Sequence, residues 1–158
     1  MKSIYVIVTT LLISACTATP DIANPAPTAI SATPKTTHLV SNYDFTTTVN
    51  RLKSTIESKG MTIFATIDHT QAAKDHGLNM QPATVLIFGN PKVGTPLMVK
   101  DPSFALQLPL KVLITQTNGQ VQVIYTPADT LIKGSQITPT EVATTLANAE
   151  KLIQATIK

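Results

Sequence analysis

The sequence is poor in residues that carry much of protein chemistry. It has one cysteine in 158 residues, no tryptophan, and 4% aromatic residues. A single cysteine cannot form an intramolecular disulfide. Because Cys16 lies near the N-terminus, the rest of the chain also lacks a thiol nucleophile and a cysteine metal ligand. The scarcity of aromatic rings argues against a stacking platform for bases or sugars.

Charged residues are also scarce. They make up 13% of the chain, the net charge is +3, and the lysines and arginines form no cluster. Binding to phosphates along a nucleic acid needs a basic stripe, so we expect no nucleic-acid partner. His69 and His76, with Met80 and Met98, form a weak metal pattern without a fixed third ligand. We therefore expect no metal, no other cofactor and no catalytic triad.

The N-terminus has the features of an export signal. Lys2 precedes an apolar run at residues 4–13, which is shorter than the roughly 20 residues that span a membrane. The run leads into "LISAC", which is similar to the bacterial lipobox, whose cysteine carries the lipid of the mature protein. We predict a signal peptide at residues 1–15 and lipidation of Cys16. The alternative is an ordinary secretory signal with an incidental cysteine.

These features predict a cell-envelope protein held on a membrane by its acylated cysteine. Thr17, rather than aspartate, follows Cys16, which resembles the pattern of lipoproteins sent to the outer membrane. In a Gram-negative cell this predicts the outer membrane, facing the periplasm. Residues 16–36 are rich in proline, alanine and threonine and predict an extended tether. Residues 37–158 have the length of one domain.

Hydrophobic periodicity predicts an α+β domain. We expect strands at residues 37–44, 61–68 and 83–89, and helices at 45–59, 70–76 and 138–158. In the strand at 61–68, alternation places Met61, Ile63, Ala65 and Ile67 on one apolar face. A capping box from Thr138 to Glu141 begins the last helix. The order predicts two layers, an antiparallel sheet with helices on one face.

Asn118-Gly119 separates two alternating runs and predicts a type I′ hairpin, in which Ile114 pairs with Val123. Ile114 and Val123 then lie on a buried face with Val112 and Tyr125, and the opposite, mainly polar face carries Leu113 and Ile124. With Leu86 and Phe88 of the preceding strand, this pair predicts an apolar patch that needs a cover. Two covers stay open, a second copy in a homodimer and the loop at residues 96–108.

The turn "IFGNPKVGT" (residues 87–95) follows an apolar strand but lacks the Gly-Lys-Ser/Thr order of a phosphate loop. It either reverses the chain or holds a small anion, if Thr95 caps a helix beginning at Pro96 and Lys92 lies nearby. Asp68-His69 ends the second strand. Here His69 is a candidate acid-base group, or Asp68 caps the short helix while His69 fills a crevice.

These residues give two hypotheses about function. The first is a binding module for a small ligand or an envelope protein, with these residues converging on one surface: Asp68, His69, Asn90, Lys92, Gly94 and Thr95. The alternative is an enzyme in which His69 is the acid-base group and Lys92 stabilises an anion. No residue is assigned a catalytic role by spacing alone.

Several motifs in the same order resemble the domain-of-unknown-function family numbered 302, over roughly residues 44–137. They are Ile67-Asp68-His69, Ala72-Ala73, Gly77-Leu78, Pro82, Phe88-Gly89-Asn90-Pro91, Gly94-Thr95 and Leu108-Pro109. The resemblance implies a TATA-binding-protein-like order of one strand, one helix, four strands and one helix. It also implies frequent dimers or fusions to envelope or redox modules. It implies no particular activity. The proline-rich segment at residues 16–36 lies outside the part of the chain that resembles the family.

Overall fold

The computed structural model describes residues 35–158, which form a five-stranded antiparallel sheet with helices on one face. The predicted signal peptide, Cys16 and nearly all of the predicted tether lie outside the described residues. The strands are β1 (Thr37–Val40), β2 (Thr62–Asp68), β3 (Ala83–Gly89), β4 (Leu110–Thr117) and β5 (Gln120–Tyr125). Their spatial order is β1-β5-β4-β3-β2. The predicted α+β class is confirmed.

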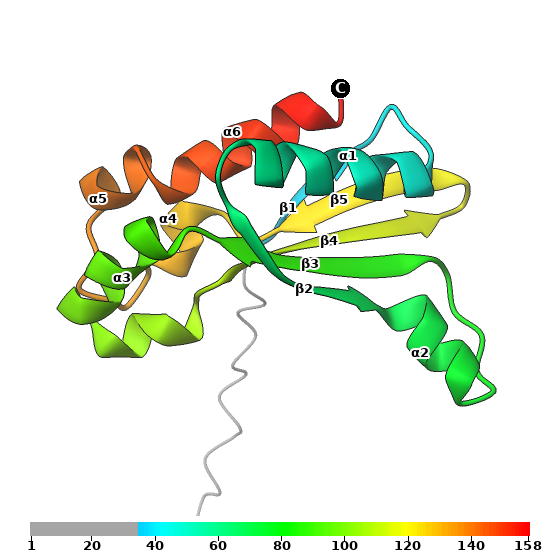
Figure 1. Cartoon of the computed structure of the whole chain (residues 1–158), viewed down its shortest axis with the longest axis horizontal. Coiled ribbons are helices and arrows are strands. Elements are labelled where there is room, and N and C mark those ends of the chain that lie inside the picture. Colours follow the sequence, from blue (N-terminus) through cyan, green and yellow to red (C-terminus); the bar gives the residue numbers. More distant parts are fainter. Residues whose placement is uncertain (1–34) are drawn as a thin grey trace, which may run out of the picture. The chain divides into compact units, whose positions relative to one another are not determined.

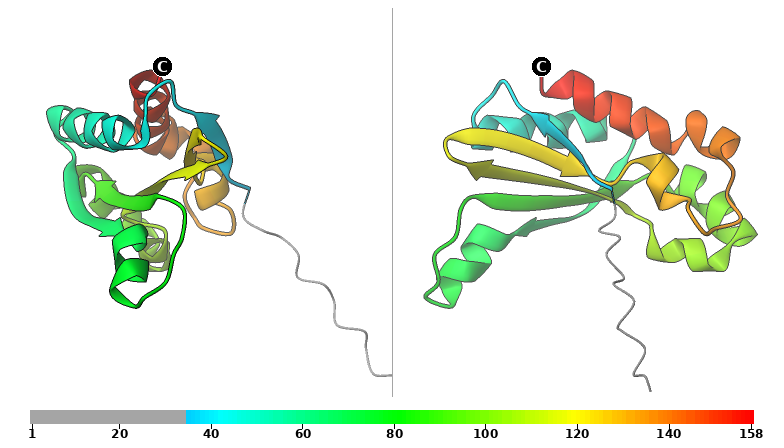
Figure 2. Two further views of the ribbon diagram at one scale, coloured as in Figure 1. Left: turned by 90° about the vertical axis from the view of Figure 1, so that its right-hand side faces the viewer. Right: turned by 180° about the vertical axis from the view of Figure 1, so that it is seen from behind.

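Two long helices cover one face of the sheet, as Figure 1 shows. They are α1 (Phe45–Ser58) and α6 (Leu146–Thr156), and Figure 2 shows both on the same side of the strands. The shorter elements are α2 (His69–Asp75), α3 (Pro91–Lys100), the 3-10 helix η1 (Pro102–Leu106), α4 (Ala128–Leu131) and α5 (Pro139–Ala143). Among residues 35–158, no helix is long and apolar enough to cross a membrane.

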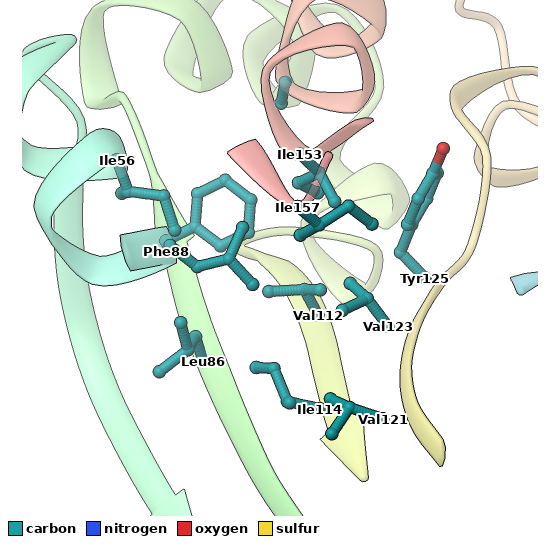
Figure 3. Close-up of a cluster of buried hydrophobic side chains, with 12 residues drawn as sticks. Ile56, Leu86, Phe88, Val112, Ile114, Val121, Val123, Tyr125, Ile153 and Ile157 are labelled. Atoms are coloured by element: carbon teal, nitrogen blue, oxygen red, sulfur yellow. The ribbon is translucent and has the colours of Figure 1, made fainter. Parts of the chain in front are cut away.

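The main hydrophobic cluster lies between the sheet and the two long helices. Phe88 of β3 is 1% exposed and packs with Ile56 of α1 and Ile153 of α6 (Figure 3). The β4–β5 hairpin has the predicted register, with Ile114 opposite Val123. Positive φ angles at Asn118 and Gly119 give the turn that this register requires. The alternating pattern therefore predicted this buried face correctly.

A bulge in β2 changes the face on which its later residues lie. Ile63 pairs with Phe88 and Ala65 with Ile87, so Phe64 is the extra residue between two regular pairs. From Ala65 onward, β2 has shifted by one residue relative to β3. Ala65 and Ile67 consequently lie on the sheet face opposite the helices, and the prediction that they share the face of Ile63 is wrong.

The face of the sheet opposite the helices carries an apolar row across four strands. Its members are paired along the sheet: Ile67 with Val85, Val85 with Leu113, and Leu113 with Ile124. Leu86 and Phe88 are instead buried on the helix side, which corrects their predicted place in this patch. The predicted cover by residues 96–108 is also wrong, because Leu97 and Phe104 pack into a second cluster. A second copy as cover stays a prediction.

That second cluster holds α3, η1, α4 and α5 together beyond the end of the sheet. Phe104 of η1 is 1% exposed and packs with Leu97 of α3, Ile132 and Val142. The predicted long C-terminal helix is divided into α5 and α6, and Thr144 and Thr145 lie between them. Val142 therefore packs in the second cluster and Ile153 in the main cluster. The predicted capping box of Thr138 and Glu141 is present.

Glu141 makes the stability of this region depend on pH. Its carboxylate accepts hydrogen bonds from Lys100 Nζ at 2.7 Å and from the Thr138 backbone and hydroxyl at 2.8 and 2.7 Å. Lys100, followed by Thr138, lowers the pKa of Glu141 from 4.5 to about 2. Because the pKa is lower in the folded protein, this contribution is present above pH 4.5 and is lost as the pH falls towards 2.

We expect Glu141→Gln to reduce the pH dependence of unfolding in that range. The free energy of unfolding of the unsubstituted protein should fall as the pH drops from about 4.5 to about 2. The variant should be less stable at pH 7 and should lose less on acidification. Urea unfolding at several pH values measures both effects, with the exposed Glu57→Gln on α1 as the matched control. Equal pH slopes in Glu141→Gln and the unsubstituted protein would contradict this assignment.

Candidate functional site

The six predicted site residues separate into two groups at opposite ends of the β2–β3 pair. Thr62 pairs with Gly89 at one end of the ladder, and Asp68 pairs with Thr84 at the other. From Gly89 to Thr84 there are five steps along β3, which span about 17 Å at roughly 3.3 Å per residue. Asp68 and His69 are therefore remote from Asn90, which follows Gly89. The predicted single surface is wrong.

At the end of the β2–β3 pair where Asp68 lies opposite Thr84, Asp68 has a structural role. It is the N-cap of α2, and its side chain accepts a hydrogen bond from the backbone N–H of Gln71 at 2.9 Å. This is the capping interpretation of the motif, in which the carboxylate satisfies a helix donor. His69 is the first residue of α2 and is exposed, so it fills no crevice. Its distance from Lys92 removes the arrangement that the enzyme hypothesis required.

At the end of the β2–β3 pair where Thr62 lies opposite Gly89, the residue that caps α3 is Asn90 rather than Thr95. The Asn90 side-chain oxygen accepts a hydrogen bond from the backbone N–H of Lys92 at 3.0 Å. Its backbone carbonyl accepts from the N–H groups of Val93 and Gly94, both at 2.9 Å. Pro91 has no N–H to offer. The first-turn donors are thus used within the helix, and the predicted anion site at free amides before Pro96 is not formed.

Three of the predicted residues do lie together, in the wall of a large pocket. Asn90, Gly94 and Thr95 line a cavity of about 660 Å³, whereas Lys92 is exposed and is not part of the lining. This volume is within the range of about 300–1,000 Å³ that small-molecule sites occupy. We call this cavity the α3–α6 pocket. Most of its exposed wall is apolar.

Local features of the sequence place the pocket walls. The β2 bulge sets Phe64 beside Gly89, where a methyl group added to the glycine would lie 3.6 Å from the Phe64 ring. Gly94 lets α3 approach Leu108, since an added Cβ would lie only 3.2 Å from its side chain. The remaining lining residues are Lys59, Met61, Asn90, Pro91, Val93, Thr95, Met98, Pro109, Leu110, Thr144, Thr145, Leu146, Asn148, Ala149, Lys151 and Leu152.

Sequence reasoning singled out the turn that carries Gly89 and Gly94 but missed the apolar walls of this pocket. The signal was the pair of glycines in "GNPKVG", which mark close approaches of the backbone. Met61, Leu108 and Leu152 come from distant segments and have no common spacing. Among residues 35–158, no three His, Cys, Asp or Glu side chains gather as a metal site.

Comparison with known proteins places this fold in a family. The sequence model named "Domain of unknown function DUF302" matches residues 37–156. The chain belongs to the DUF302 family. The crystal structure of the uncharacterized conserved protein DUF302 from Bacillus stearothermophilus superimposes with a TM-score of 0.65 at 20% identity, covering 77% of this chain and 94% of that one. Because the neighbour consists almost entirely of the shared fold, a DUF302 domain forms without a segment like residues 1–34.

Curated relatives match a shorter part of the chain than the family model does. "Fluoride-specific ion channel FluC 1" of Brucella suis is 37% identical over 73 residues, which are 46% of this chain and 29% of that protein. "Fluoride-specific ion channel FluC 2" of Brucella melitensis has the same identity over 73 residues, 27% of its length. The chain thus spans less than a third of the length of these relatives, and the channel function is a statement about them.

Proposed function

We propose that this chain is a lipid-anchored cell-envelope protein whose DUF302 domain binds a small, mainly apolar ligand in the α3–α6 pocket. The pocket carries this proposal, because it combines a volume of about 660 Å³ with mainly apolar walls and a few polar side chains at its edge. The exposed residues Thr95 and Asn148 are among those polar groups. Binding requires no catalytic group.

A bulky side chain at the pocket edge should prevent binding. We expect Thr95→Trp to weaken binding of the neutral apolar dye N-phenyl-1-naphthylamine about tenfold or more, because the indole would occupy ligand volume. Val99→Trp is the matched control: Val99 is on the same helix, is 77% exposed and does not line the pocket. Dye fluorescence measures both affinities on residues 35–158, the part of the chain that the structure describes. Equal weakening by the two variants, or no saturable dye binding, would contradict the proposal.

The membrane anchor rests on the "LISAC" pattern before Cys16. We expect the full chain, expressed in a bacterial host with a lipoprotein pathway, to incorporate labelled palmitate and to partition into the membrane fraction. Cys16→Ser should abolish labelling, because the thiol that accepts the lipid is removed. Mass spectrometry of the mature N-terminus checks this independently, and an unmodified Cys16 would rule out the anchor while leaving the pocket proposal intact.

A further inference from the structure

The charges around the α3–α6 pocket have one sign. Lys59, the residue that caps the C-terminus of α1, and Lys151 of α6 both line it and are both exposed. No aspartate or glutamate of the described chain is among the lining residues. The one ion pair within residues 35–158 joins Lys100 to Glu141, so neither pocket lysine is neutralised by a carboxylate there. The pocket edge is therefore cationic.

The wall behind this edge is suited to a flexible chain. Met61 and Met98 both line it, and their unbranched side chains adapt to irregular apolar ligands. Phe64 adds an aromatic surface that is 52% exposed. The uncharged polar groups at the pocket edge are hydroxyls and amides, such as Thr95 and Asn148. The apolar part of a ligand can pack against this wall, whereas the two lysines would repel a positively charged group on the ligand.

We infer that the ligand is an anionic amphiphile, an aliphatic chain with one carboxylate or phosphate group that meets Lys59 and Lys151 while the chain enters the pocket. This inference rests on the proposed function and specifies its ligand class. A free aliphatic carboxylate and an anionic lysophospholipid share this chemistry. Burying each methylene should tighten binding about fourfold. The exposed lysines should together add about threefold to tenfold, because solvent screens each contact.

The test compares ligands that differ in charge or in chain length. Isothermal titration calorimetry on residues 35–158 would use octanoate and 1-octanol as a charge pair. Hexanoate, octanoate and decanoate would form a length series. We expect octanoate to bind about threefold to tenfold more tightly than 1-octanol. Decanoate should bind about 250-fold more tightly than hexanoate if all four added methylenes are buried. The affinities for decanoate and for decanoyl-lysophosphatidylglycerol then show whether a free aliphatic carboxylate or an anionic lysophospholipid binds more tightly.

Replacement of the lysines tests the role of charge directly. The double variant Lys59→Gln/Lys151→Gln should bind octanoate only as well as it binds 1-octanol, with 1-octanol affinity unchanged within twofold. Lys111→Gln/Lys133→Gln is the control, since both lysines are exposed and neither lines the pocket. Equal binding of octanoate and 1-octanol by the unsubstituted protein would overturn the inference that the ligand is anionic. The proposal that the α3–α6 pocket binds an apolar ligand would remain. Binding of neither would overturn the proposed function as well.

Discussion

Phe88→Ala should lower the free energy of unfolding by about 3–5 kcal/mol, the usual cost of replacing a fully buried phenylalanine with alanine. Phe88 is 1% exposed and lies in the main cluster between the sheet and the helices α1 and α6 (Figure 3). Neighbouring strands on both sides hold it in place, through pairing with Ile63 and Leu110. The side chains around it therefore cannot collapse fully into the space that the ring leaves.

The measurement is urea unfolding followed by circular dichroism, together with the melting temperature. A loss of this size should lower the melting temperature by about 10–20 °C for a domain of this length. Phe64→Ala on the neighbouring strand is the matched control, because Phe64 is 52% exposed and should lose less than half as much stability. Equal losses for the two variants would mean that Phe88 does not have the buried position described here.

The sequence predicted most of the sheet, because alternating side chains and turn residues are local signals. Asn118-Gly119 determined the hairpin and its register, and that register placed Val112, Val123 and Tyr125 on the buried face. The strand β2 shows the limit of this reasoning. Its pattern was regular, but the bulge at Phe64 reversed the faces of Ala65 and Ile67. A bulge depends on what the strand packs against and has no signal in this alternation.

The candidate site was harder to predict because its walls come together only through tertiary structure. Asp68-His69 and Asn90 both adjoin strand ends, yet the antiparallel pairing of β2 and β3 places them at opposite ends. Thr95-Pro96 resembled a helix start, but Asn90-Pro91 provides an earlier one, and α3 continues through Pro96. The pocket walls at Phe64, Leu108 and Leu152 depend on how α3 and α6 are placed relative to the sheet.

Phe104→Ala should also lower the free energy of unfolding by about 3–5 kcal/mol. The loss should affect different elements of the domain from those that Phe88→Ala affects. Phe104 is 1% exposed in the second cluster, which holds α3 to the segments carrying Ile132 and Val142. This cluster shares few residues with the main one, so its loss should loosen α3 before it loosens β4. Because α3 forms one wall of the α3–α6 pocket, ligand binding should weaken as well.

Hydrogen exchange measured by mass spectrometry separates this effect from global unfolding. In Phe104→Ala, amides of α3 should lose more protection than those of β4, whereas Phe88→Ala should lower protection in both, because the main cluster supports the whole sheet. Leu106→Ala is the control from the same 3-10 helix, where Leu106 is 81% exposed and should change neither. If Phe104→Ala lowers protection equally in α3 and β4, the two clusters unfold as one cooperative unit, and the pocket wall has no independent stability.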